Sequence, residues 1–149
     1  EGGIRIPMIV RWPGKIKPGS VSDYPWAFCD VLPTLCELAG TRGVPRNVDG
    51  ISVAPTLLGK AQDPSRPLYW ESPERGGLHQ AVRMGKWKGV RLGLEPPLEL
   101  YDLSADIGET KNVAAEHKDV VAKMEEFLRD CRTDSPEYPV GRRRTGKQT

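Results

Sequence analysis

The first fourteen residues place the strongest constraint on how this chain can fold. Two glycines lead into the apolar, largely β-branched run Ile4–Val10, and Trp12-Pro13-Gly14 ends it. The run is more continuous than alternating, which is typical of a strand buried on both faces of a sheet. Pro7 has no N–H for a ladder, so it marks a strand end, a bulge or an edge. The sequence predicts a buried strand near residue 1, yet little of the remaining chain is suited to supply its sheet.

The bulk composition indicates a folded chain that is rich in loops. Its 149 residues are 38% hydrophobic and 28% charged, which suits one ordinary domain. No apolar run approaches the roughly 18–20 residues of a membrane span, and no signal-peptide pattern opens the chain. A net charge of +2 is too mild to indicate a polyanion, so we expect no nucleic acid and no membrane as partners. Cys29, Cys36 and Cys131 lack metal-ligand spacing and are interpreted as buried free thiols.

The first half of the chain contains two helical patterns. Residues 23–39 carry one apolar stripe, and Gly40 follows it as a left-handed stop. The stripe consists of Val31, Leu32, Leu35, Leu38 and Ala39. Ser52 is placed to cap a short second helix that Gly59 closes. Residues 63–67, Asp-Pro-Ser-Arg-Pro, form a rigid polar hinge, where we place the main internal boundary.

The second half predicts a small antiparallel sheet. Its four strands are expected at 68–71, 80–84, 87–91 and 98–103, with residues 72–78 as a loop. Gly85-Lys86 suits a type II′ hairpin turn because glycine takes the first turn position. Residues 114–131 form the clearest helix. Its apolar stripe is Val120, Val121, Met124, Phe127, Leu128 and Cys131.

The expected fold class is therefore α+β. A small antiparallel sheet of about four strands packs on a long C-terminal helix, preceded by a strand and two helices left over from a larger α/β domain. The predicted domains are residues 1–62 as the piece of the large domain and residues 63–134 as the sheet-and-helix domain. Residues 135–149 form a basic tail, which the cluster Arg142-Arg143-Arg144 marks as a solvated terminus.

Groups that could carry chemistry are few. Neither a phosphate-binding loop nor a nucleophile with its base is recognisable from spacing. His117 is expected on the solvated side of the last helix. His79 stands where a Gly-rich loop enters the hairpin, so it is a candidate for substrate contact. From the residues alone, the chain has no self-contained active site.

Several motifs in order resemble the C-terminal part of the sulfatases. The matching motifs are Glu1-Gly2-Gly3-Ile4-Arg5-Ile6-Pro7, Trp12-Pro13-Gly14, Asp30-Val31-Leu32-Pro33-Thr34, Asp49-Gly50-Ile51-Ser52, Gln80 to Lys88, Glu99 to Leu103 and Asp106 to Asn112. The last of these has Ile107 where the family has proline. The first motif is similar to the segment that follows the family's active-site lysine. The resemblance covers residues 1 to about 131.

The resemblance implies hydrolysis of sulfate esters on an alkaline-phosphatase-like superfold. Such enzymes use a formylglycine, made from Cys or Ser in a Cys/Ser-x-Pro-x-Arg motif, and a calcium ion held by Asp and Asn. None of the three cysteines here is followed by Pro-x-Arg. No catalytic residue and no metal ligand of the family therefore transfers to this segment. The resemblance places formylglycine and calcium in a preceding N-terminal part, and the segment is expected to be inactive by itself.

The remaining expectations concern partners and site residues. The segment is expected to complete the large domain, to wall the substrate cleft and to bind a small-molecule or glycan sulfate ester. Glu71, His79 and Arg83 are candidate substrate-side residues, or simply surface of the sheet domain. An unpaired first strand would allow self-association. The family implies a periplasmic, secreted or lysosomal location. Alternatives are a non-catalytic binding module and part of a phosphoester or phosphonate hydrolase of the same superfold.

Overall fold

The chain consists of two compact units, and each is described by itself. The computed structural model describes residues 1–41, 47–74, 77–93, 95–133 and 135–136. The sheet unit contains Glu1–Gly2 and the chain from Pro67 onward, and the helical unit contains Gly3–Arg66. The chain therefore starts on the sheet unit, crosses at Gly2–Gly3 and returns at Arg66–Pro67. The expected domain boundary lay slightly earlier, between residues 62 and 63. Most of the basic tail lies outside the described residues.

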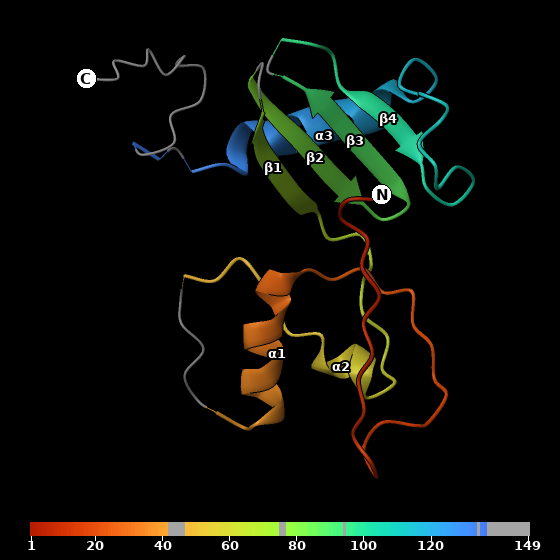
Figure 1. Cartoon of the computed structure of the whole chain (residues 1–149), viewed down its shortest axis with the longest axis vertical. Helices are drawn as coiled ribbons and strands as arrows, with labels where there is room; N and C mark the ends of the chain where they lie inside the picture. The colour runs from red at the N-terminus through yellow and green to blue at the C-terminus, as the bar shows by residue number, and fades with distance from the viewer. Residues whose placement is uncertain (42–46, 75–76, 94, 134, 137–149) are drawn as a thin grey trace. The chain divides into compact units, whose positions relative to one another are not determined.

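The sheet unit has the predicted α+β architecture. Its strands are β1 (Leu68–Glu74), β2 (Gly77–Met84), β3 (Trp87–Leu92) and β4 (Glu99–Asp102). They form one antiparallel sheet in the order β1-β2-β3-β4. Helix α3 (Lys118–Asp130) lies across one face of this sheet, as Figure 1 shows, and no helix among the described residues of this unit covers the other, here called the open face.

Local turn chemistry explains the central hairpin. Met84 pairs with Trp87 across the predicted two-residue turn, and Gly85 has a φ of 58°. Lys86, the second turn residue, does not have a positive φ. The turn is therefore of type II′, whose twist matches that of the strands. The predicted loop at residues 72–78 is wrong over most of its length. Ser72 pairs with His79 and Pro73 with Leu78, because β1 is an edge strand, where a proline is tolerated.

The core of the sheet unit lies between the sheet and α3. It is built from buried side chains of β2, β4, the loops on either side of β4, and α3: Val82, Leu98, Leu100, Val113, Met124 and Leu128. Gly89 allows this close packing, since a Cβ at that position would lie 2.8 Å from the Met124 sulfur. The predicted apolar stripe of α3 is confirmed, but the helix begins at Lys118 rather than near residue 114. A separate turn precedes it, closed by the bond from Glu116 N to Val113 O at 3.0 Å.

His117 is not on a solvated helix face, as the sequence suggested. It is half-buried at the start of α3, with its ring centroid 4.6 Å from that of Trp87. Since His117 is the N-cap residue, it stands outside the helical repeat on which the expectation rested.

The chain after the sheet protects the edge at β4. The Asn112 side-chain oxygen accepts a hydrogen bond from Leu100 N at 3.1 Å and one from Ala114 N at 3.0 Å. Val113 N in turn donates to Leu100 O at 2.8 Å. An amide side chain and one backbone group thus replace a fifth strand beside Leu100.

A buried carboxylate organises the helical unit. Its helices are η1 (Phe28–Asp30), α1 (Val31–Leu38) and α2 (Ala54–Leu57). The fully buried Asp30 side chain accepts from Ala27 N at 2.8 Å, from Ile51 N at 2.9 Å and from Arg66 Nη2 at 2.5 Å. It therefore joins the start of α1, the loop before α2 and the last residue of the unit.

Thr34 and Gly50 hold together the same segments that Asp30 joins. Thr34 is buried, donates to Asp30 O at 2.6 Å and accepts from Val53 N at 2.9 Å. Gly50 lies against the backbone of Cys29, where a Cβ would come within 1.9 Å of the carbonyl oxygen. The helical turn begins at Phe28 rather than Asp23, while the stops at Gly40 and Gly59, both with positive φ, are as predicted.

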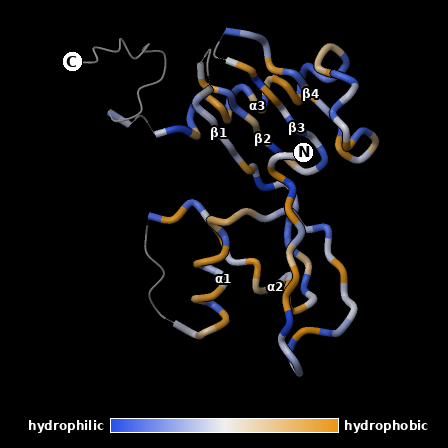
Figure 2. Tube along the Cα trace, in the orientation of Figure 1, coloured by the Kyte–Doolittle hydropathy of each residue, from blue (hydrophilic) through white to orange (hydrophobic). Residues whose placement is uncertain are grey.

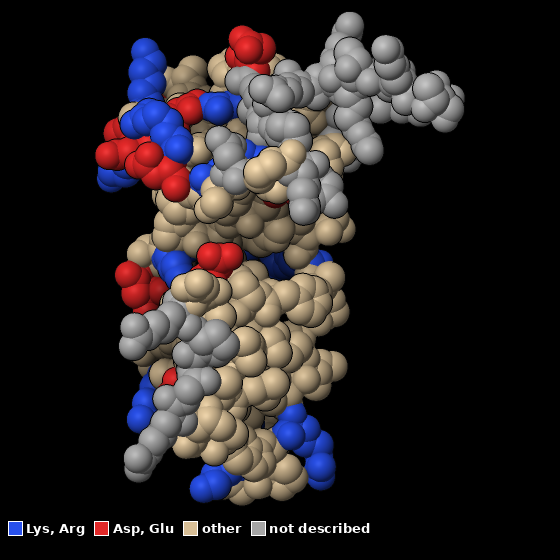
Figure 3. All heavy atoms as spheres, turned by 90° about the vertical axis from the view of Figure 1, so that its left-hand side faces the viewer, with Lys and Arg blue, Asp and Glu red and all other residues tan. Residues whose placement is uncertain are grey.

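The buried first strand is wrong for this chain. Residues 5–12 form neither a helix nor a strand, and Ile9 is 91% exposed. The stripe predicted on α1 is also partly exposed, at Leu32 and Leu35. A continuous apolar run needs strand partners on both sides, and this unit has no strand among its described residues. Figure 2 shows the hydrophobic residues along this extended segment and on α1, and the face in Figure 3 has few charges on the helical unit.

Candidate functional site

The open face of the sheet carries two of the three candidate substrate residues. His79 and Arg83 both lie on β2, and because side chains alternate along a strand they share one face. His79 is paired with Ser72 and Leu92, and Arg83 with Leu68 and Lys88. Both side chains are half-buried, and Arg83 Nε donates to Gly85 O at 3.2 Å. The structure thus brings an imidazole and a guanidinium to one surface.

Glu71 lies on the opposite, helix-covered face. Glu71 pairs with Gln80, which is next to His79 along β2 and therefore belongs to the opposite face of the sheet. The Glu71 carboxylate accepts from Tyr69 Oη at 2.8 Å and from Arg132 Nε at 3.1 Å. Burial first of all, and then the bond to Glu71, raise the pKa of Tyr69 to about 12, although the bond from Gln80 acts in the opposite direction. The phenol therefore stays protonated, and Glu71 is committed to a contact with the segment that follows α3.

A buried lysine forms the most polar cluster of the sheet unit. Lys88 on β3 has a side chain that is only 6% exposed. Its Nζ lies 2.5 Å from Glu109 Oε1 and 3.6 Å from Glu1 Oε1. The terminal nitrogen of Glu1 also contacts Glu109. A charge this deeply buried is stable only when it is paired, so the cluster fixes three distant points of the chain together.

The acidic side chains and the cysteines of the described residues are dispersed. Within the described ranges, no three His, Cys, Asp or Glu side chains are grouped so that they could hold a metal ion. All three cysteines are free; Cys29 is exposed, contrary to the expectation, and the other two are half-buried. Burial raises the pKa of the Cys131 thiol, which makes it a poor nucleophile.

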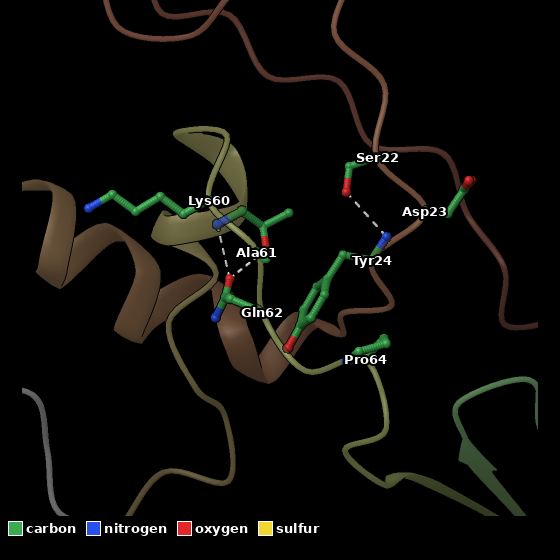
Figure 4. A pocket seen from close by; sticks show the side chains of 8 residues that line it. Ser22, Asp23, Tyr24, Lys60, Ala61, Gln62 and Pro64 are labelled. Atoms are coloured by element: carbon green, nitrogen blue, oxygen red, sulfur yellow. Dashed lines mark hydrogen bonds between the residues drawn. The ribbon is translucent and has the colours of Figure 1, made fainter.

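A shallow hollow of about 380 Å³ lies in the helical unit. Its lining comes from the chain before η1 and from the segment after α2: Ser22, Asp23, Tyr24, Thr56, Lys60, Ala61, Gln62 and Pro64. Figure 4 shows that its polar groups bind one another. Gln62 Oε1 accepts from Thr56 N and Oγ1 at 3.0 and 2.6 Å, and Gln62 Nε2 donates to Ser52 O at 3.0 Å. These groups hold the loop in place and leave the hollow without a reactive pair.

Sequence reasoning missed Lys88, Glu109 and Asp30. The signal for Lys88 was present, because in the predicted hairpin it shares a face with the apolar Val90. Glu109 has a left-handed backbone, with φ of 54°, which is uncommon for a residue with a side chain and cannot be read from its type. Asp30 stands out in the sequence only as part of a family motif, because its partner Arg66 is distant along the chain.

A comparison with protein families places the chain. Residues 1–134 match the family described as "N-sulphoglucosamine sulphohydrolase, C-terminal". Human arylsulfatase A is 34% identical over 137 residues, which cover 76% of this chain and 27% of that protein. The chain spans about a quarter of the length of the curated relatives it matches.

Solved structures show the same relationship. A protein solved in complex with its substrate D-glucosamine-2-N,6-O-disulfate is 26% identical, with a TM-score of 0.69, over 83% of this chain and 27% of that one. A phosphonate monoester hydrolase from Silicibacter pomeroyi is 28% identical, with a TM-score of 0.60, over 80% of this chain and 27% of the other. Both align with the segment over only part of their own length.

Proposed function

The chain belongs to the N-sulphoglucosamine sulphohydrolase C-terminal family, and we propose that it is the C-terminal portion of an enzyme that hydrolyses sulfate esters. The observation that carries this proposal is the family match over residues 1–134. The chain spans about a quarter of its relatives' length, so the enzyme would be completed by a preceding part. Within that enzyme the segment completes the fold and forms one wall of the substrate cleft.

The catalytic centre, in this proposal, lies in the preceding part. Formylglycine would supply the nucleophile, and calcium would stabilise charge on the sulfate oxygens. The described residues carry no grouped metal ligands, and none of the cysteines has the Pro-x-Arg continuation. Both groups are therefore assigned to the rest of the enzyme, and the isolated segment is inactive.

The apolar surface of the helical unit supports the role in completing the fold. Its exposed side chains come from the N-terminal segment, η1, α1 and the loops: Ile6, Met8, Ile9, Val21, Phe28, Leu32, Leu35 and Leu58. Large exposed apolar surfaces mark contacts with other protein surfaces. We assign this surface to contact with the preceding part of the sulfatase. In the isolated segment the same surface would favour self-association.

The open face of the sheet supports the role at the substrate. A sulfate ester keeps a negative charge, and guanidinium and imidazolium groups donate strong hydrogen bonds to such oxygens. His79 and Arg83 present this chemistry on one face, and we assign them to the substrate side. Glu71 is the weakest of the three candidates because Tyr69 and Arg132 already bind it on the other face.

Turnover of an aryl sulfate tests the proposal. The 149-residue chain is expected to give no turnover, and the same segment within the longer chain that contains the preceding part is expected to hydrolyse the ester. Turnover by the purified short chain would overturn the assignment of the catalytic centre. A longer chain that folds, carries formylglycine and still leaves every sulfate ester intact would contradict the sulfatase function itself.

A second candidate is a phosphonate or phosphoester hydrolase of the same superfold. The similarity to the Silicibacter pomeroyi enzyme favours it. Assaying an aryl phosphonate monoester beside the aryl sulfate separates the two. Turnover of the phosphonate alone would select the second candidate, and turnover of neither by a folded longer chain would leave the binding module as the remaining alternative.

A further inference from the structure

The buried cluster around Lys88 lies where the chain leaves the sheet unit. Of the first 66 residues only Glu1 and Gly2 belong to this unit. The Glu1 side chain is 6% exposed, and its Oε1 accepts no hydrogen bond although it lies 3.6 Å from Lys88 Nζ. A buried carboxylate oxygen in this position gains its stability from the ammonium group, because burial alone disfavours its charge.

Glu109 is the second carboxylate on Lys88, and the turn that carries it is fixed by hydrogen bonds that do not involve Glu1. The Asp106 side chain accepts from Thr110 N at 2.7 Å and from Lys111 N at 2.8 Å, which fixes the turn that carries Glu109. Glu109 has a φ of 54°, a conformation that glycine adopts at lower cost. The ion pair at 2.5 Å to Lys88 accounts for a glutamate in this place.

We propose that Lys88, backed by Glu109, is a positioning residue that anchors Glu1, and with it the chain leading into this segment, on the open face of the sheet. The proposal rests on the proposed function, which puts the catalytic centre in the part that precedes Glu1. Through this anchor the sheet unit fixes the place at which the catalytic part of the chain reaches it.

The charge on the backbone nitrogen of Glu1 distinguishes two possible sources of the anchor. In the 149-residue chain the terminal nitrogen of Glu1 is an ammonium group that contacts Glu109. Where another residue precedes Glu1, that nitrogen is an uncharged amide, and among the described ion pairs Lys88 is the cation that lies between the two carboxylates. Acetylation of the terminus reproduces this state in the short chain. The anchor must persist in the acetylated chain if Lys88 is its source.

Backbone order at Gly2 and Gly3, measured by ¹⁵N relaxation in the acetylated 149-residue chain, tests the anchor. We expect order parameters near the rigid value of about 0.85 in the unaltered chain and below about 0.6 in Glu1→Gln and Lys88→Met. Glu1→Gln is the principal variant because it leaves the Lys88–Glu109 pair intact. Lys86→Met is the matched control, since Lys86 forms an exposed ion pair with Asp102, and it should leave both glycines ordered.

Two results of this measurement would overturn the anchor. Mobile glycines in the unaltered acetylated chain would show that the charged terminus alone held Glu1. Glycines that stay rigid in Glu1→Gln would show that the carboxylate does not hold them. If Lys88→Met fails to fold, the double variant Lys88→Met/Glu109→Gln removes both charges of the pair and repeats the test.

Kinetics of the longer chain test the positioning role. We expect Glu1→Gln to lower kcat for an aryl sulfate at least about tenfold with KM changed less than twofold, since small displacements of a catalytic group are costly. Lys86→Met should change neither. An unaltered kcat in a variant whose glycines are mobile would refute the positioning role. Absence of turnover in the unaltered longer chain would refute the proposed function instead, and the relaxation result would still decide the anchor.

Discussion

The two units of this chain are stabilised in different ways. The sheet unit encloses an apolar core between its sheet and α3, in which Val82, Leu100 and Met124 are fully buried. The helical unit has few buried apolar residues, and its joint is the carboxylate of Asp30 with the hydroxyl of Thr34. Many of its larger apolar side chains are exposed.

The difference supports the proposal that the helical unit belongs to a larger domain. A unit that buries its own apolar side chains gains its stability locally. A unit that exposes them and relies on a few buried hydrogen bonds is organised for contact with other protein surface. The sheet unit thus resembles a small domain, whereas the helical unit resembles one face of a larger one.

Replacing Asp30 tests the polar joint and is expected to have the largest effect. Asp30→Ala leaves Arg66 without its carboxylate and two backbone N–H groups without an acceptor, which costs about 3–5 kcal/mol. Hydrogen exchange followed by mass spectrometry should show faster exchange throughout residues 28–57 and little change in β2 and β3. The exposed Asp23→Ala serves as control. Equal acceleration in both units would mean that they unfold together, and the comparison would fail.

Replacing Met124 tests the apolar core. Met124→Ala removes a fully buried side chain from between α3 and Gly89, and the loss of contacts and the resulting cavity cost about 2–5 kcal/mol. Urea unfolding should show the loss in the sheet unit, with exchange in α1 and α2 unaffected. Met8→Ala, at an exposed methionine, is the matched control. A change below about 0.5 kcal/mol would indicate that the core is loosely packed.

Acid titration tests the surface electrostatics of the sheet unit, with a smaller effect. The hydrogen bond from Lys86, and next that from Ser104, lower the pKa of Asp102 to about 2. Because the folded pKa lies below the unfolded one, the contribution to stability is present above about pH 4 and disappears as the pH falls through 2. The pair is partly exposed, so its contribution is no more than about 1 kcal/mol.

Carboxyl ¹³C chemical shifts, followed as the pH is changed, measure the pKa of Asp102 directly. Lys86→Met should raise the pKa of Asp102 toward 4. The pKa of Asp106 should not change, since the N–H of Lys111 is the main group that lowers it. An Asp102 that titrates near 4 in the unaltered chain would contradict the ion pair.

Replacing Ile9 is expected to have the smallest effect on stability. The side chain is 91% exposed, so Ile9→Ser should change the free energy of unfolding of the 149-residue chain by less than about 0.5 kcal/mol. Light scattering should show weaker self-association in the variant. A large loss of stability would mean that Ile9 is buried in solution, and the contrast between the units would need revision.

Sequence reasoning succeeded where structure depends on nearby residues. The hairpin at Gly85-Lys86 and the stripe of α3 follow from turn chemistry and helical period. The prediction of a loop at 72–78 failed because proline and glycine were taken as turn signals, while the pairing of β1 with β2 extends through Pro73. The prediction of a buried first strand failed because an apolar run indicates only that a strand would need neighbouring strands. The described residues of this unit contain no strand that could pair with it.

The candidate site was harder to predict for the same reason. His79 and Arg83 share a face by strand alternation, but the predicted strand began at residue 80 and left His79 in the loop before it. The Lys88 cluster joins residues 1, 88 and 109, and the Asp30 joint spans 36 positions to Arg66. Such groups come together only in the tertiary structure, so their contacts cannot be predicted from the type of each residue alone.

The side chain of Asn112 makes the two edges of the sheet unequal as places for an additional strand. With Asn112 and Val113 beside Leu100, the rim at β4 has lost donors and acceptors that an incoming strand would need. The rim at β1 is the longer one, and Pro73 on it lacks an N–H. A further strand is therefore hindered at β4, and at β1 it would have to pair in a register that needs no donor from Pro73.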